Sequence, residues 1–99
     1  MLLITGQFTA KPERREELIQ IAQSLFEPSR AETGCISYKF YEETIGRNCF
    51  LFFEEWVSQE AIDEHFQTLH FKKFMQLFPQ LVVKEPSLKI YEIKEVRNL

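Results

Sequence analysis

The segment Cys49–Trp56, with the sequence CFLFFEEW, restricts the possible folds of this chain more than any other stretch. Its length and aromatic content are typical of a β-strand, whose successive side chains point to opposite faces. One face would carry Phe50, Phe52, Glu54 and Trp56, and the other Cys49, Leu51, Phe53 and Glu55. Because both faces are largely apolar, both have to be covered in the folded protein.

Three further segments have the composition of strands. They span residues 2–10, 35–43 and 88–96 and are rich in aliphatic and aromatic side chains. The short segment around Gly46 is typical of a turn, which would join 35–43 to 49–56 as a hairpin. Four strands are therefore expected, and the two in the middle of the chain should pair with each other.

A helical region is expected between the first two strands. Pro12 is favourable in the first turn of a helix, because its missing N–H would have no partner there. Apolar side chains then recur at helical spacing and form a buried stripe of Leu18, Ile21, Ala22, Leu25 and Phe26. Pro28 should kink or break this helix, and Gly34 is suited to end it.

A second helical region should follow the strand at 49–56. Ser58 is a good N-cap for it, and Thr68 could cap a renewed helical turn that continues to Pro79. The apolar positions before the break are Ile62, His65, Phe66 and Leu69, and those after it are Phe71, Phe74, Met75 and Phe78.

The order of elements, β-α-β-β-α-β, indicates an α+β protein with the ferredoxin-like arrangement. Two helical regions would cover one face of a four-stranded antiparallel sheet, in a single domain of residues 1–99. The open face would carry Cys49, Leu51 and Phe53, and a second copy of the same sheet is its simplest cover. We therefore expect a homodimer through the open sheet face, which forms a dimeric α+β barrel.

Composition narrows the partners and the location. The net charge is −3 and no Lys/Arg-rich stripe is present, so no nucleic-acid partner is expected. No apolar run approaches the roughly 20 residues of a membrane helix. The opening MLLITGQF lacks the basic start of a signal peptide, so the expected location is cytoplasmic. Cys35 and Cys49 lack a C-x-x-C spacing and are expected to be free.

The residues best suited to chemistry lie between Glu54 and His70, a stretch that holds the only Trp and both His of the chain. Glu54 and Trp56 share a strand face. On one continuous helix His65 and His70 would diverge by about 140°, so they converge only if the helix breaks at Thr68. His suits proton transfer near neutral pH, and aromatic side chains would form a wall for a flat substrate.

These residues also have structural interpretations. His65 could be a core histidine bonded to the backbone, and His70 could serve only the turn that restarts the helix. Trp56 could be a core anchor, and Glu54 a solvated acid at a strand end. His65, His70 and Glu54 could together supply three metal ligands, but a five-residue His spacing matches no common metal motif, so no metal is expected.

The same stretch resembles the antibiotic biosynthesis monooxygenase domain family. The matching pattern is a strand ending in E-x-W followed by H-x-x-T-x-H and an aromatic residue, which here are Glu54–Trp56 and His65–Phe71. Upstream, Ser29–Tyr38 (SRAETGCISY) looks like the family's passage from the first helix into the second strand. The resemblance covers nearly the whole chain and implies a small dimeric α+β barrel.

The resemblance implies a quinol monooxygenase-like enzyme that oxidises a quinol or small polycyclic phenol with O2, with no cofactor. A base removes a phenolic proton, and the resulting anion passes one electron to O2. His65 would be the base or proton shuttle, and Glu54 would orient it. The substrate would contact Trp56, Phe52, Phe50, Thr68, His70 and Tyr38. The hairpin register, which the sequence leaves open, decides whether Tyr38 shares the face of Glu54.

Two other functions remain open at this point. Some members of the family isomerise a phosphorylated signalling metabolite, and such a substrate would need anion-binding groups, for which Lys39, Arg47 and Lys72 are the candidates. Other members have no known activity, so a non-enzymatic dimeric binding domain is the second alternative.

Overall fold

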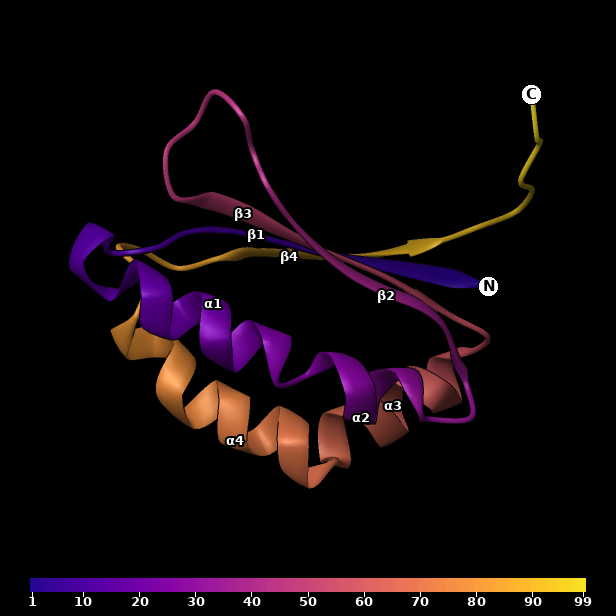
Figure 1. Cartoon of the computed structure of the whole chain (residues 1–99). Coiled ribbons are helices and arrows are strands. Elements are labelled where there is room, and N and C mark those ends of the chain that lie inside the picture. Colours follow the sequence, from indigo (N-terminus) through magenta and orange to yellow (C-terminus); the bar gives the residue numbers. More distant parts are fainter.

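Four antiparallel strands form one sheet in the computed structural model, which describes residues 1–99 (Figure 1). They are β1 (Leu2–Thr9), β2 (Cys35–Glu42), β3 (Cys49–Trp56) and β4 (Ser87–Glu92). Their order across the sheet is β2-β3-β1-β4, so the two central strands come from different parts of the chain. This is the order of the ferredoxin-like arrangement, and the predicted α+β fold class is confirmed.

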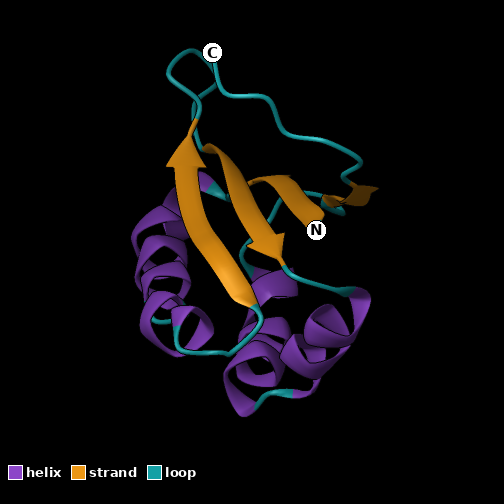
Figure 2. Ribbon diagram, turned by 90° about the vertical axis from the view of Figure 1, so that its right-hand side faces the viewer, coloured by secondary structure: helices purple, strands orange, loops and turns teal.

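The helices all lie against the same face of the sheet (Figures 1 and 2). They are α1 (Arg15–Gln23), α2 (Phe26–Arg30), α3 (Gln59–Gln67) and α4 (Leu69–Leu77), with short 3-10 turns at Pro12–Arg14 and Phe78–Gln80. Figure 1 shows α1 and α4 running side by side beneath the strands. None of the helices has the length and apolar character needed to cross a membrane.

Strand β3 lies inside the sheet and has the two faces expected from its sequence. Phe50, Phe52, Glu54 and Trp56 are buried beneath the helices. The alternate residues Cys49, Leu51, Phe53 and Glu55 are only half-buried on the open face. The helical face of β3 is therefore part of the core, and the open face has no second layer in a single chain.

Both predicted helix breaks are present. Pro28 lies inside α2, and the break between α1 and α2 falls three to four residues earlier, at Ser24 and Leu25. Proline has no N–H to bond the carbonyl one turn before it, which favours a break at this point. Thr68 has an extended backbone (φ −69°, ψ 153°), ends α3 and caps α4 by accepting a hydrogen bond from the Phe71 N–H at 3.3 Å.

Gly34 does not end the first helical region as predicted. Helix α2 already ends at Arg30, and no glycine of the chain has a positive φ. A Cβ at Gly34 would lie 2.3 Å from the Cβ of Ala61 in α3. Gly34 therefore allows the start of β2 to approach α3 closely, which explains the glycine by packing rather than by backbone conformation.

Two other expectations at the edges of elements were wrong. Strand β4 ends at Glu92 rather than at residue 96, because its ladder with β1 runs out at the Leu2–Glu92 pair. Leu69, placed by periodicity on the apolar face, is 68% exposed, because the break at Thr68 shifts the face that the following helix turns inward.

We predict that Gly34→Ala lowers the free energy of unfolding by about 1–3 kcal/mol, the usual cost of overpacking a tight contact. Urea denaturation would measure it. Gly46→Ala is the matched control, because the nearest atoms there belong to the flexible Glu43 side chain, at 3.1 Å, and to Cys49. Equal losses in the two variants would contradict the packing explanation.

Candidate active site

An apolar cavity of about 250 Å³ lies between the helical face of the sheet and the helices. Its wall is largely aromatic, with Phe8 and Phe52 from the sheet and Phe74 and Phe78 from the α4 region. These rings contact one another, at 4.9 Å between the centroids of Phe8 and Phe78 and 5.7 Å between those of Phe52 and Phe74. Such a rigid aromatic wall suits a small, flat ligand.

Glu54 is the one carboxylate that lines this cavity, and its residue is only 7% exposed. Burial raises the pKa of Glu54 to about 7, with a further contribution from the negative charge of Glu32. The Trp56 indole donates a hydrogen bond to Oε1 of Glu54 at 3.0 Å, and this bond opposes the increase. At neutral pH, Glu54 can therefore both accept and release a proton.

Tyr38 shares the face of Glu54. The two residues are direct partners in the β2–β3 ladder, so the register that the sequence left open brings them side by side. Tyr38 is buried, lines the same cavity, and its ring lies 5.8 Å from the ring of Phe52. Burial raises the pKa of the Tyr38 phenol, so this side chain stays neutral in the cavity wall.

His65 is 1% exposed and lies behind the cavity wall. Its Nδ1 is 2.7 Å from Oε2 of Glu32, whereas its Nε2 has no hydrogen-bond partner and lies 3.9 Å from Oε1 of Glu54. The ring is packed against Trp56, at 4.6 Å between centroids. Burial lowers the pKa of His65, and the hydrogen bond to Glu32 opposes this. A neutral ring with a bare Nε2 is the result.

His70 joins the same group from the surface side. Its Nε2 lies 2.8 Å from the Oε2 of Glu32 that also contacts His65, and its side chain is 22% exposed. The predicted break at Thr68 is what turns the two histidines toward one point. The helix break therefore has a clear role in building this polar cluster.

Glu32 was not predicted as a site residue, whereas Glu54 was predicted to orient His65. It is Glu32 that bonds Nδ1 of His65, at 2.7 Å, and Glu54 stands at the other ring nitrogen. Glu32 lies in the turn before β2, and the Cys35–Trp56 pair at the start of the β2–β3 ladder brings that turn beside the end of β3. Two features of the sequence could have pointed to Glu32. They are the predicted pairing of 35–43 with 49–56 and the presence of an acid within Ser29–Tyr38, just before the first of these strands.

The three atoms Oε2 of Glu32, Nδ1 of His65 and Nε2 of His70 lie within 4.8 Å of one another. Two ligands of one tetrahedral ion, each at about 2.0–2.2 Å from it, would lie roughly 3.3–3.6 Å apart. The contacts here, at 2.7 and 2.8 Å, are shorter and match hydrogen bonds to a carboxylate. The geometry therefore favours a hydrogen-bonded cluster over a coordination site, and Glu54 is not a member of it.

The other predicted site residues support the cavity without lining it. Trp56 bonds Glu54 and packs on His65, and Thr68 donates a hydrogen bond to the backbone oxygen of His65 at 2.7 Å. Phe50 stacks on Phe40 at 5.1 Å between centroids and is not part of the cavity lining. Of the predicted set, Tyr38, Phe52 and Glu54 line the cavity, and the rest do not.

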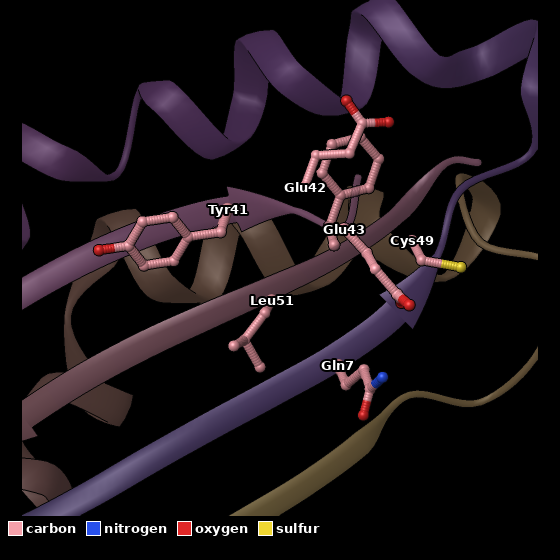
Figure 3. A pocket seen from close by; sticks show the side chains of 7 residues that line it. Gln7, Tyr41, Glu42, Glu43, Cys49 and Leu51 are labelled. Carbon is pink, nitrogen blue, oxygen red and sulfur yellow. The ribbon is translucent and has the colours of Figure 1, made fainter. Parts of the chain in front are cut away.

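A second hollow, of about 290 Å³, lies near the β2–β3 hairpin. Figure 3 shows its side chains projecting from three neighbouring strands, among them Gln7, Tyr41 and Leu51. Glu42, one of the acids in its lining, forms an ion pair with Arg15, which lowers the pKa of the Glu42 carboxyl. The hollow has no histidine in its lining, so it is a poor candidate for acid–base chemistry.

The fold and the site together define a small ferredoxin-like α+β domain with an aromatic cavity and a buried acid–histidine pair. The sequence pattern of the family "Antibiotic biosynthesis monooxygenase" matches residues 1–77. The chain belongs to this family, as its resemblance predicted.

Individual relatives agree with this assignment. The uncharacterized protein sll1783 of Synechocystis sp. is 45% identical over 98 residues, which are 99% of this chain and 67% of that protein. "Putative monooxygenase YcnE" of Bacillus subtilis is 37% identical over 75 residues, covering 76% of this chain and 79% of that protein. The structure of Rv0793 from Mycobacterium tuberculosis has a TM-score of 0.92 at 25% identity and 98% coverage of both chains. The general class of function is therefore monooxygenase-like.

We predict that Glu54 makes the protein less stable as the pH rises. In the unfolded chain its carboxyl loses its proton near the ordinary value of 4.5, but in the folded protein only near 7. The folded state thus binds more protons between these values, and its stability falls as the pH rises through this window. Glu54→Gln removes this dependence. Its free energy of unfolding, relative to that of wild type, should therefore rise by about 1–3 kcal/mol from pH 5 to pH 8.

Urea denaturation of wild type and Glu54→Gln at pH 5 and at pH 8 measures this change in stability. Glu64→Gln, which changes an exposed carboxylate of α3, is the control and should show no such gain. A constant difference between wild type and Glu54→Gln from pH 5 to 8 would mean that the buried acid titrates like an exposed one.

Proposed function

We propose that this protein is a cofactor-independent monooxygenase that oxidises a quinol or small polycyclic phenol with O2. The observation that carries the proposal is Glu54, a carboxyl with a pKa of about 7 in the wall of an aromatic cavity. A phenolic substrate needs a base that is ionised near neutral pH and a site that excludes water, and Glu54 offers both.

In this reaction the substrate supplies the electrons. The base takes one phenolic proton, and the resulting anion passes one electron to O2. The two radicals then combine and form a carbon–oxygen bond, and the second oxygen atom leaves as water. A quinol and one O2 thus give a hydroxyquinone and one water. The protein has to hold the ring, accept the proton and keep bulk water away from the radical pair.

The proposed roles follow the positions of the side chains. Glu54 lines the cavity and is assigned the first proton transfer, because His65 stands behind the wall. His65 keeps the second role expected for it, that of a shuttle, through the bare Nε2 that faces Glu54. Tyr38 and Phe52 pack against the substrate ring from β2 and β3.

The cavity favours an apolar aromatic substrate over a phosphorylated sugar. Among its lining residues Lys89 of the edge strand β4 is the one cation, and none of the candidate anion-binding residues Lys39, Arg47 and Lys72 is part of the lining. A phosphate group would be costly to bury without cationic partners. This supports an oxygenase over the isomerase alternative.

The open face of the sheet supports a homodimer. Tyr41 of β2 is 51% exposed there and pairs with the half-buried Leu51 of β3 (Figure 3). Phe53 of β3 is also half-buried on this face, and Tyr91 of β4 is 43% exposed. Apolar side chains on a sheet face that has no second layer are often covered by a partner. A second copy related by a two-fold axis would set the same face against itself, as an isologous dimer.

We predict that the purified, metal-depleted protein consumes O2 when a reduced naphthoquinol is added. Glu54→Gln should lower kcat by about 10²-fold or more, because a general base contributes about 10²–10⁴-fold. The wild-type rate should rise with pH through a pKa near 7. An oxygen electrode with stopped pH steps would measure both effects.

The control for this experiment is Glu55→Gln. Glu55 is the next residue of β3, points to the opposite face and accepts a hydrogen bond from Ser37 at 2.7 Å. It should keep the wild-type rate. Oxygen uptake equal to that of buffer, or a rate independent of pH between 5 and 9, would refute the proposed activity for this substrate class.

We predict that the chain, with a mass of 11.9 kDa, is a dimer at micromolar concentration in native mass spectrometry. Phe53→Glu places a charge in the centre of the open face and should yield monomers, because a buried unpaired charge is strongly unfavourable. Glu64→Gln on the exposed side of α3 should leave the dimer intact. A wild-type monomer would exclude this interface.

A further inference from the structure

We propose that Gly6 determines which aromatic ring systems the cavity accepts. The space above Gly6 holds the second ring of a fused bicyclic quinol, whose hydroxylated ring lies beside Glu54. The inference rests on the proposed function, because it narrows the substrate of the same site. Gly6 lies inside β1 and lines the cavity, together with Phe52 of β3 and Leu88 of β4, its partners on the two neighbouring strands.

Neither the backbone nor the packing requires a glycine at position 6. No glycine of the chain has a positive φ, so other residues could adopt the same backbone conformation. An added Cβ would lie 2.3 Å from Ala61 at Gly34, whereas at Gly6 the nearest atom beyond the adjoining residues is 3.2 Å away. Glycine weakens the interior of a strand, and where it occurs there it often marks the close approach of a ligand.

The space above Gly6 is open toward the helices. A Cβ at this position would lie 3.2 Å from Cδ2 of Leu88 and 3.7 Å from Cβ of Phe52, and no helix atom lies within 4 Å of it. Sheet and helix meet on both sides, because Phe52 contacts Phe74 and Phe8 contacts Phe78, at 5.7 and 4.9 Å between ring centroids. The two layers therefore leave a gap at the one position that lacks a side chain.

The strand register connects this gap to Glu54. Two adjacent rows cross the helical face of the sheet, each with one residue from every strand. They are Tyr38, Glu54, Ile4 and Ile90, and Phe40, Phe52, Gly6 and Leu88. Two residues along a strand span about 7 Å, which is close to the length of two fused aromatic rings. A second ring fused to the one beside Glu54 would therefore extend over Gly6.

The cavity has the size and the surface for such a ligand. Its volume of about 250 Å³ is below the roughly 300–1,000 Å³ of sites that enclose drug-sized molecules, so it favours a small substrate. The lining around Gly6 is apolar, with Phe8, Phe52 and Leu88, and the carboxyl of Glu54 lies in the next row. A polar group on the second ring would lose its hydration there without gaining a partner. The second ring is therefore expected to carry no polar substituent.

The first test measures binding in the absence of O2, so that no oxidation takes place. NMR titration compares 2-naphthol with phenol on wild type and on Gly6→Ala. The added methyl group would occupy the place of the second ring, and one methylene too many in an apolar pocket costs about 10–200-fold. Gly6→Ala should thus bind 2-naphthol about tenfold or more weakly and phenol within about twofold of wild type.

Gly46→Ala is the matched control. It adds the same group in the β2–β3 hairpin, outside the cavity, and should bind both ligands like wild type. Unchanged binding of 2-naphthol by Gly6→Ala, or equal weakening of both ligands, would overturn the role of Gly6. The variant should fold, because the atom nearest to the new methyl group is the end of Leu88, which is 64% exposed and can turn outward.

Leu88→Ala is a second variant, at an exposed position where the fold does not depend on the side chain. It removes the outer border of the gap. The affinity for 2-naphthol should fall about fourfold, the value of one buried methylene group, and the affinity for phenol should not change. An equal effect on the two ligands, or no effect on 2-naphthol, would place the second ring elsewhere and overturn the proposal.

The second test compares a reduced naphthoquinol with a reduced benzoquinol in the oxygen-uptake assay. Gly6→Ala should lower kcat/KM for the naphthoquinol about tenfold or more relative to the benzoquinol, through a higher KM, because Glu54 is unchanged. A loss shared equally by both substrates would overturn the role of Gly6 and leave the reaction standing. Binding of 2-naphthol that depends on Gly6, without oxygen uptake from either quinol, would instead refute the reaction and leave the role of Gly6 standing.

Discussion

The need to cover β3 on both faces governs the rest of the molecule. Helices have to pack against a central strand that carries Phe50, Phe52 and Trp56 on one side. Between these helices and the sheet a cavity lined by aromatic side chains remains. Glu54 belongs to this same buried face, so the acid is desolvated by the packing that stabilises the fold. The buried acid and the core therefore share one face of one strand.

The polar cluster depends on interruptions of regular structure rather than on regular structure itself. An unbroken helix would have sent His65 and His70 in different directions, and a Cβ at Gly34 would have held the turn with Glu32 away from α3. Thr68 satisfies the helix ends that its own break creates, through one accepted and one donated hydrogen bond. The break is thus stable enough to define the position of His70 relative to His65.

Much of this arrangement can be predicted from the sequence, because it depends on residues that are close together along the chain. The two faces of β3, the Ser58 cap and the break at Thr68 each follow from residues within one strand or one helical turn. The contacts of Glu32 could not be predicted in the same way, since its partner His65 is 33 residues away and the pairing depends on how β2 docks. The register that brings Tyr38 to Glu54 is likewise a tertiary result.

The close approach of Gly34 to Ala61 has a consequence for folding. Glu32 reaches the histidines only when the β2–β3 hairpin has docked against α3. In a partly folded chain Glu54 would be hydrated and would ionise as an ordinary acid. The raised proton affinity of Glu54 is thus a property of the completed tertiary structure, and the chain acquires it together with its final packing.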